Sequence, residues 1–381
     1  MKIEFNIPPY LGNEPETIAD AARRHKIAGD GYYTKACQGI LEERTGTHKA
    51  LLTSSCTDAL EMAALLTEIG PGDEVIAASY TFVSTVLPFV LRGASIVFID
   101  VDPTTMNLDL AALEEAIGPK TKVICLTHYA GVAVDMDRVM EIAKKQDLLV
   151  VEDAAQGVMS QYKGRALGSI GHLGCYSFHE TKNYSSGEGG ALLVNDPRFL
   201  ERAEILREKG TNRSQFHQGL VDKYTWHDLG SSFLMSDINA AYLYPQFLRM
   251  DEINEARLAL HALYQRRLSG HPELELQEIP SYATHNAHMF YIKLKDNATR
   301  TSLTAHLKDQ GIGAVFHYIP LHSSPAGLRH GRFHGADLHT TKDSERLLRL
   351  PLYFGLTEKE VEEVCDAVLG FFGSTLKENR P

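Results

Sequence analysis

Residues 148–157 read LLVVEDAAQG, and the apolar part of this run is typical of a strand that is buried on both faces of a parallel sheet. Similar runs lie on either side of it along the chain: EVIAAS at 74–79, SIVFIDV at 95–101, KVICLTHYA at 122–130 and GALLVN at 190–195. Stretches with apolar residues three and four positions apart separate them, as in LDLAALEEAIG and DMDRVMEIAKKQ. This alternation predicts an α/β fold whose mostly parallel central sheet is covered by helices on both faces.

The length of the chain indicates two domains, because 381 residues are more than a single hydrophobic core usually serves. We predict a large domain over residues 1–245 and a small α+β domain over residues 246–381. A long helical segment from about residue 235 to residue 268 is expected to link them. The small domain is inferred from HMFYIKLK at 288–295, TSLTAHLKDQGI at 301–312, AVFHYIPLH at 314–322 and EKEVEEVCDAVLGFF at 358–372.

Composition and charge argue against nucleic-acid binding and against a membrane protein. The chain is 44% hydrophobic and its net charge is −11, so its overall field does not attract a phosphate backbone. No apolar run approaches the roughly 18 residues of a membrane span, and residues 1–10 lack a secretory signal, so a cytoplasmic location is expected. The five cysteines are scattered without a CxxC pair, which favours reduced thiols over a disulfide framework.

Two titratable residues follow predicted strands. Asp153 comes directly after the apolar run, so we expect it at the carboxyl end of a strand, where open α/β sheets bind ligands. A carboxylate there can cap the next turn or hold the nitrogen of a pyridine ring. Lys182 follows the short run CYSF and precedes three glycines, and a loop lysine is usually only solvated. Together, however, the two residues supply the amine and the acid that pyridoxal phosphate (PLP) chemistry requires.

A phosphate site is the third requirement of that chemistry. The turn SSCTDAL at 54–60 follows an apolar segment and opens a helical pattern. Its backbone N–H groups and the Thr57 hydroxyl are therefore expected to face an anion at a helix amino terminus. Simple capping by Ser55 or Thr57 explains the same residues, and both interpretations can hold together. Ser177 is a further candidate donor.

Longer motifs extend over nearly the whole chain. They are SSCTDALEMAAL, GDEVIAASYTFVST, HYAGVAVDMD, VVEDAAQG, SFHETKNYSSGEGG, LREKG, MSDINAAY and FHYIPLH. In these motifs the chain resembles the DegT/DnrJ/EryC1/StrS sugar aminotransferases. The resemblance implies the type I, aspartate aminotransferase-like fold, PLP as cofactor, and a homodimer in which the segment near residues 229–235 completes the partner's active site.

The resemblance also implies roles for individual residues. Lys182 is expected to hold PLP as a Schiff base, and Asp153 is expected to bond the pyridine nitrogen. The other implied cofactor contacts are Gln156 to the ring hydroxyl, Phe82 stacked on the ring, and Thr57, Asp58 (through its backbone) and Ser177 on the phosphate. Without the resemblance, Phe82 would be interpreted equally well as a core aromatic and Gln156 as a solvated helix residue.

One position departs from the pattern of the family. Many relatives carry an Asn in a GxN motif that reaches the phosphate of the neighbouring subunit, whereas here Gly230 is followed by Ser231 and Ser232. A Ser232 hydroxyl can donate the same bond from a shorter reach. Some relatives that dehydrate sugars replace the Schiff-base lysine by His; Lys182 is present, which favours transamination.

Candidate substrate contacts come from two parts of the chain. Diphosphate and sugar contacts are expected from Lys209, Arg213, Lys223, His317, Tyr318 and His322, although a charged loop is often only solvated. The histidines at 317, 322, 330, 334 and 339 do not predict a metal site. Gly331 weakens a helical pair of His330 with His334, and no cysteine lies nearby.

The resulting functional hypothesis is amino transfer from L-glutamate to the C4 keto group of dTDP-4-dehydro-6-deoxyglucose. Two alternatives stay open at this point. Another PLP enzyme of nucleotide sugars, such as a 3-aminotransferase, a UDP-sugar aminotransferase or a dehydratase, would share nearly every cofactor residue. A non-catalytic regulatory or scaffold protein would have no need of the cofactor residues together. The expected partners are thus small-molecule substrates and a second copy of the chain.

Overall fold

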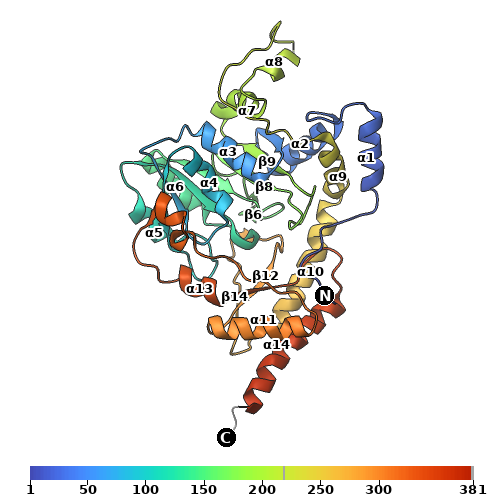
Figure 1. Cartoon of the computed structure of the whole chain (residues 1–381), viewed down its shortest axis with the longest axis vertical. Coiled ribbons are helices and arrows are strands. Elements are labelled where there is room, and N and C mark those ends of the chain that lie inside the picture. The colour runs from blue at the N-terminus through green and yellow to red at the C-terminus, as the bar shows by residue number, and fades with distance from the viewer. Residues whose placement is uncertain (218, 379–381) are drawn as a thin grey trace.

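The computed structural model describes residues 1–217 and 219–378, and a central sheet of eight strands dominates this part of the chain (Figure 1). The strand order is β1-β9-β8-β5-β4-β2-β3-β13. The strands are β1 (Lys49–Thr53), β2 (Glu74–Ala78), β3 (Ser95–Ile99), β4 (Thr121–Thr127), β5 (Leu149–Asp153), β8 (Leu173–Ser177), β9 (Gly190–Val194) and β13 (Gly331–Phe333). All neighbours from β8 to β13 are parallel. The predicted α/β class with a mostly parallel sheet is therefore confirmed.

The run GALLVN forms β9, which is antiparallel to both of its neighbours, β8 and β1. A parallel pairing needs a crossover connection, usually a helix, to carry the chain back across the sheet. Here the chain turns back through residues 178–189 without a helix, and the Phe178 N–H donates to the Gly189 carbonyl at 2.8 Å. This loop projects from the edge of the sheet at which β5 and β8 end.

Helices cover both faces of the sheet because successive side chains of a strand point to opposite sides. In β2, Val75 and Ala77 pack into one hydrophobic cluster, whereas Ile76 and Ala78 pack into the other. The cluster that contains Val75 and Ala77 is covered by α3 (Cys56–Leu66), α4 (Leu87–Leu91) and α7 (Leu200–Arg207). The other cluster is covered by α2 (Tyr32–Thr45), α5 (Leu110–Ala116), α6 (Met136–Gln146) and α9 (Asp237–Leu248).

A smaller α+β unit lies at the opposite end of the molecule from α7 and α8 (Arg213–His217) (Figure 1). Its antiparallel sheet has the order β10-β12-β14, formed by β10 (Glu275–Leu276), β12 (Phe290–Lys293) and β14 (Leu347–Leu350). Its hydrophobic cluster lies between this sheet and three helices, α10 (Met250–Leu268), α11 (Asn297–Asp309) and α14 (Glu358–Glu378). Ile3 of the amino-terminal segment is part of the same cluster.

The other described α-helices and strands are short. They are α1 (Glu14–Arg23), α12 (Gly327–His330), α13 (Thr340–Arg346) and the small sheet of β6 (Gln161–Tyr162), β7 (Arg165–Ala166) and β11 (Ala283–Thr284). β13 falls within residues 246–381, the predicted small domain, and yet it pairs with β3 of the central sheet. The division at residues 245 and 246 therefore stays a prediction. Within the described ranges, no helix is long and apolar enough to cross a bilayer.

The long helical segment expected from about residue 235 to residue 268 consists of two helices, α9 and α10. They are separated at Arg249, whose backbone is not helical (φ −121°, ψ 27°). Pro245 lies inside α9, and a proline crowds the preceding turn. The Arg249 N–H donates to the Gln246 carbonyl at 3.1 Å rather than to the carbonyl four residues back, so α9 ends there and α10 starts at Met250.

Candidate active site

A cavity of about 490 Å³ lies where the carboxyl ends of the parallel strands meet the small unit. The large unit lines it with the start of α3, the segment 81–84, the end of β5 and the loop 177–189. The small unit lines it with the segments 288–289, 317–318 and 349–352. This is the edge at which open parallel sheets bind ligands.

Asp153 is the last residue of β5 and its carboxylate faces the cavity. Its Oδ2 accepts a hydrogen bond from the Thr85 hydroxyl at 2.6 Å, and its Oδ1 accepts one from the Ala155 N–H at 3.1 Å. The bond to Ala155 is the turn-forming role that a carboxylate at a strand end commonly takes. The side chain is buried but lines the cavity, so turn formation and ligand binding are compatible.

Lys182 lines the same cavity from the loop between β8 and β9. Short backbone bonds hold this loop: the Lys182 N–H donates to His179 at 2.9 Å, and the Glu180 N–H donates to Gly187 at 2.8 Å. Gly187 has φ +80°, a conformation that glycine adopts without strain. Burial lowers the pKa of the Lys182 ammonium, and the positive charge of Arg349 lowers it further against the attraction of Asp153. Lys182 is therefore not the solvated loop lysine of the simpler interpretation.

The amino terminus of α3 opens into the cavity. Ser55 is the N-cap residue, and its Oγ accepts the Asp58 N–H at 3.0 Å. Thr57 donates from its hydroxyl to Ser84 at 2.9 Å, and both residues line the cavity. Capping is thus observed, and the Asp58 N–H already has a partner, so a phosphate there must share it. Ser177, the last residue of β8, is buried at the same cavity.

Gln156 and Phe82 also line the cavity. Gln156 is buried; its Oε1 accepts the Ala130 N–H at 2.6 Å, and its Nε2 donates to the Tyr318 hydroxyl at 3.2 Å. It is not a solvated helix residue. Phe82 is 55% exposed, so it is not a core aromatic, and its ring lies 6.2 Å from that of Tyr318.

The predicted substrate residues divide into two groups. His317 and Tyr318 line the cavity with their rings stacked at 3.8 Å. Burial lowers the pKa of His317 to about 2, with Arg349 and Lys182 adding to the effect, so this imidazole is neutral at physiological pH. His322 does not line the cavity: its Nδ1 lies 2.7 Å from the Ser79 hydroxyl.

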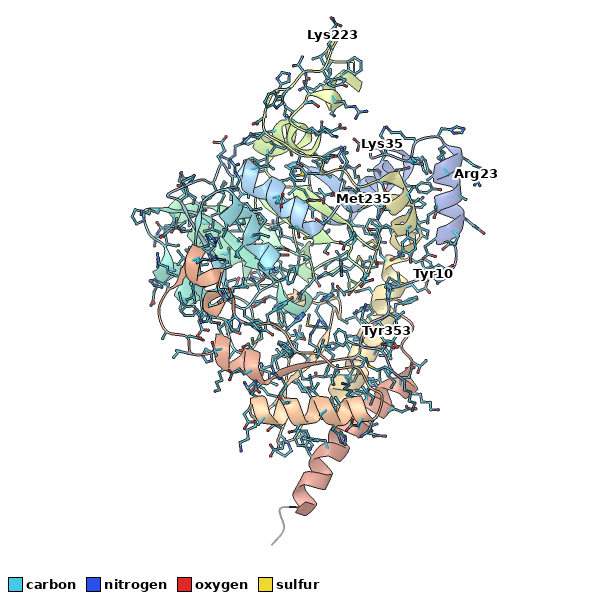
Figure 2. All side chains as sticks on the ribbon, viewed as in Figure 1. Tyr10, Arg23, Lys35, Lys223, Met235 and Tyr353 are labelled. Carbon is cyan, nitrogen blue, oxygen red and sulfur yellow. The ribbon has the colours of Figure 1, made fainter. Side chains whose placement is uncertain are left out.

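The charged loop after α7 is remote from the cavity within one chain. Lys209 follows α7, Arg213 begins α8 and pairs with Glu208 at 3.2 Å, and Lys223 lies at the tip of this projection (Figure 2). Ser232 forms an isolated bridge with Glu208 at the base of the same projection. These four residues do not line the cavity of their own chain. Their contacts with ligands therefore stay predictions.

Sequence reasoning missed three residues of the site. Arg349 lines the cavity from β14, and His288 lines it with its Nδ1 2.9 Å from the Asn183 Oδ1. Burial and the charge of Lys182 hold the pKa of His288 well below its usual range. Thr85 lies behind Asp153 and bonds its carboxylate. For Arg349 the only signal was a charge inside the apolar run LLRLPL, which is also typical of an exposed edge strand.

Comparisons with known proteins agree with this geometry. The family model described as the DegT/DnrJ/EryC1/StrS aminotransferase family matches residues 11–369. The spore coat polysaccharide biosynthesis protein SpsC of Bacillus subtilis is 33% identical over 331 residues, which are 85% of each chain. The aminotransferase TlmJ of Streptoalloteichus hindustanus has a similar structure, with a TM-score of 0.90 and 29% identity over 98% of this chain and 100% of that one.

A second similar protein has been solved in two cofactor forms. The putative sugar aminotransferase Spr1654 of Streptococcus pneumoniae, in its PMP form, matches with a TM-score of 0.89 and 26% identity over 96% of this chain and 98% of that one. The same protein also matches in its PLP form. The family model matches most of the described residues, and SpsC is 33% identical to this chain over 85% of each chain. This protein therefore belongs to the DegT/DnrJ/EryC1/StrS aminotransferase family and is a PLP-dependent aminotransferase.

Proposed function

We propose that this protein transfers the amino group of L-glutamate to C4 of dTDP-4-dehydro-6-deoxyglucose, yielding dTDP-4-amino-4,6-dideoxygalactose and 2-oxoglutarate. Family membership supports a sugar substrate, as does similarity to a polysaccharide biosynthesis protein. The motifs SFHETKNY, EKGTNRSQF, VDKYTW and GSSFLMSD support the particular sugar, because they resemble the corresponding transaminase of enterobacterial common antigen synthesis. The single observation that carries the proposal is the meeting of Lys182 and Asp153 in one cavity.

The donor set of the cavity fits PLP. Lys182 supplies a primary amine with a lowered pKa, Asp153 supplies a carboxylate, and Thr57 and Ser177 supply hydroxyls beside the amino terminus of α3. A helix amino terminus favours a phosphate dianion through its N–H groups and its dipole. When it is bound, PLP supplies an electron-poor ring that stabilises negative charge on the carbon that loses a proton.

Lys182 moves the proton in this proposal. A lowered pKa leaves its Nζ uncharged at a lower pH than an ordinary lysine, so Nζ can take the α-proton of the amino donor and return a proton to the sugar carbon. Asp153 would hold the proton of the ring nitrogen, and Thr85 fixes the direction of its Oδ2. Gln156 would contact the ring hydroxyl, and Phe82 would cover the ring face.

The neutral imidazoles of His288 and His317 add hydrogen-bonding capacity without adding charge. With Tyr318, His317 forms a flat stacked surface beside the cavity, against which a sugar ring can pack. In our proposal His322 holds the segment that carries these rings in place, because it bonds Ser79 and does not face the cavity.

A homodimer is part of the proposal, because Lys209, Arg213, Lys223 and Ser232, in the projection after α7 and at its base, do not line the cavity of their own chain. In a dimer the projection after α7 extends to the partner, where Ser232 donates to the cofactor phosphate and Lys209, Arg213 and Lys223 contact the diphosphate of the sugar nucleotide. Equilibrium sedimentation tests this arrangement, and cross-complementation tests it further. Mixing a Lys182→Ala chain with a Lys223→Ala chain should restore one complete site per dimer.

The substrate is tested by incubating the purified protein with L-glutamate and a panel of nucleotide keto-sugars. The panel compares dTDP with UDP and the 3-keto with the 4-keto position, and mass spectrometry detects the gain of an amine. NMR of the product then determines the configuration at C4. Amination of a UDP-sugar or a 3-keto sugar in preference to the dTDP-4-keto sugar would contradict the proposal, as would a gluco product.

A further inference from the structure

Two rings that face the cavity lie on a segment without regular structure. Residues 316–320 belong to no helix or strand of the described structure, although His317 and Tyr318 within them line the cavity. Before this segment the chain is held to β14 by an isolated bridge at Val315. Ile319 is 68% exposed, so its side chain does not anchor the segment in a hydrophobic core. The position of the two rings therefore depends on contacts made by other parts of the chain.

The first of these contacts comes from Tyr80, which follows β2 in the large unit. Its hydroxyl donates to the His317 carbonyl at 2.5 Å, and its Oη lies 3.2 Å from the Tyr129 hydroxyl. Its ring, which is fully buried, packs edge to face on the rings of Tyr129 and Tyr318, with centroids 5.1 and 5.5 Å apart. A buried tyrosine hydroxyl normally has a hydrogen-bond partner. Here that partner is the backbone of the segment that carries the two rings.

Ser79 holds the far end of the same segment. Its carbonyl accepts the Leu321 N–H at 2.9 Å, and its Oγ accepts the His322 N–H at 3.1 Å. The same Oγ lies 2.7 Å from the His322 Nδ1, so the serine hydroxyl can donate to that ring nitrogen. Ser79 is fully buried, and its own N–H donates to Ile99 of β3 at 3.1 Å. The central sheet therefore fixes the residue that holds the segment.

The residues after Tyr80 form part of the cofactor side of the cavity. Phe82, two residues further on, lines the cavity, and the Thr85 hydroxyl bonds the Asp153 carboxylate at 2.6 Å. Residues 79–85 are thus bonded to a cofactor residue at one end and to the segment with the two rings at the other. An element shared by both walls of a cavity fixes the distance between them, and this is how supporting bonds maintain the geometry of a site.

We propose that Tyr80 and Ser79 are positioning residues for the sugar substrate. They hold residues 316–322 so that the stacked imidazole and phenol rings meet the sugar at a fixed place beside the cofactor. This inference rests on the proposed function, in which the stacked pair packs against a sugar ring. Tyr80 and Ser79 do not line the cavity themselves, so they act through the segment and do not touch the reacting atoms. Their loss should therefore weaken sugar binding and leave the reaction with the amino donor intact.

The first test needs no substrate and measures backbone hydrogen exchange of the holoenzyme by mass spectrometry. Tyr80→Phe removes one hydroxyl and keeps the ring contacts, and Ser79→Ala removes the other hydroxyl. In each variant we expect the amides in peptides covering residues 316–322 to exchange on the order of tenfold faster than in the parent, since a bond that holds the segment is lost. The effects of the two changes should not be additive in the double variant, because both bonds hold one segment.

Tyr176→Phe is the matched control. Like Tyr80, Tyr176 is buried and donates from its hydroxyl to a backbone carbonyl, that of Leu167 at 2.6 Å. It lies in β8 and does not line the cavity. Tyr176→Phe should lower the melting temperature about as much as Tyr80→Phe. It should leave the exchange of residues 316–322 and both half-reactions at their parental values.

The second test separates the two half-reactions of the holoenzyme by single-turnover absorbance measurements. For Tyr80→Phe the apparent Kd for the nucleotide keto-sugar should rise on the order of tenfold, since the rings lose one bond that fixes their place. The rate at saturating sugar and the apparent Kd for L-glutamate should each change by less than about threefold, because the bonds of Asp153 and Lys182 do not involve the lost hydroxyl. A merely structural role would instead lower both half-reactions together.

Parental exchange rates in both variants would overturn the inference, and so would an equal loss in the two half-reactions. Faster exchange with an unchanged Kd for the sugar would also overturn it, because the rings that the segment carries would then not meet the substrate. If no nucleotide sugar is aminated, the proposed function fails, whereas the exchange measurement still decides whether Tyr80 and Ser79 hold residues 316–322. The two failures are therefore distinguishable.

Discussion

Thr85 is expected to control the activity of Asp153 although it does not line the cavity. Its hydroxyl donates to the Asp153 Oδ2 at 2.6 Å in a fully buried position. Valine has nearly the same shape as threonine, so Thr85→Val removes the donor and leaves the packing intact. The carboxylate then keeps one protein donor, the Ala155 N–H at 3.1 Å, and is free to rotate.

The size of the effect follows from the number of donors that remain. A hydrogen bond to a buried charged group contributes about 1.5–3 kcal/mol, and Asp153 loses one of two, so we expect a loss of about 2 kcal/mol in the free energy of unfolding. A loss of about 2 kcal/mol in transition-state stabilisation corresponds to roughly a 30-fold fall in kcat/KM for glutamate.

Thr340 provides a matched control outside the site. Its hydroxyl donates at 2.6 Å to the buried carboxylate of Asp100, which keeps four further donors, the N–H groups of Val101, Leu338, His339 and Thr340. Thr340→Val should therefore cost about 1 kcal/mol of stability, less than Thr85→Val, and should not change kcat/KM. Stability is measured by urea unfolding of the holoenzyme and activity by steady-state kinetics with glutamate.

Two results would refute this reasoning. One is a Thr85→Val enzyme with parental stability and turnover, which would show that the short bond to Asp153 carries no free energy. The other is an equal loss of activity in Thr340→Val, which would show that the effect on turnover comes from general destabilisation and not from the direction of the Asp153 carboxylate.

Three further predictions concern the amine, a buried guanidinium and a buried carboxylate. Lys182→Ala should abolish the visible absorption of the bound cofactor and lower turnover by roughly 10³-fold or more; a parental spectrum would show that another amine binds PLP. Arg257→Met should lower the free energy of unfolding by about 3 kcal/mol in a urea titration, because three buried carbonyl groups lose their donor; an unchanged midpoint would contradict this. Burial alone would raise the pKa of Glu152, but bonds from His128 and from backbone N–H groups outweigh burial and lower it. Its stabilisation is therefore present above the ordinary value of 4.5 and lost as the pH falls below it, so the unfolding free energy of Glu152→Gln should decline less than that of the parent as the pH falls from about 4.5 to about 3.

The central sheet was predictable from the sequence because strands buried on both faces are continuous apolar runs in the sequence. EVIAAS, SIVFIDV and LLVVEDAA became β2, β3 and β5 within a residue or two of the predicted limits. The direction of β9 was not predictable in the same way, since GALLVN is apolar in either orientation. Its direction depends on the connection after β8, where no helix forms.

The cofactor-binding part of the candidate site could also be predicted largely from the sequence. Asp153 and Lys182 follow strands, and the carboxyl ends of parallel strands meet at one edge whatever the rest of the chain does. The substrate-binding part was harder to predict, because it depends on how the small unit lies against that edge. Of six predicted substrate residues, only His317 and Tyr318 line the cavity.

What the sequence alone determined is the layered fold and the residue pair Asp153 and Lys182, because both follow from short-range patterns of burial and strand termination. Tertiary structure alone decided which distant side chains face that pair. Arg349 and His288 come from segments more than a hundred residues further along the chain than Lys182, and their spacing carries no periodic signal. Their convergence depends on packing between two hydrophobic cores, and packing of this kind is a property of the folded chain as a whole.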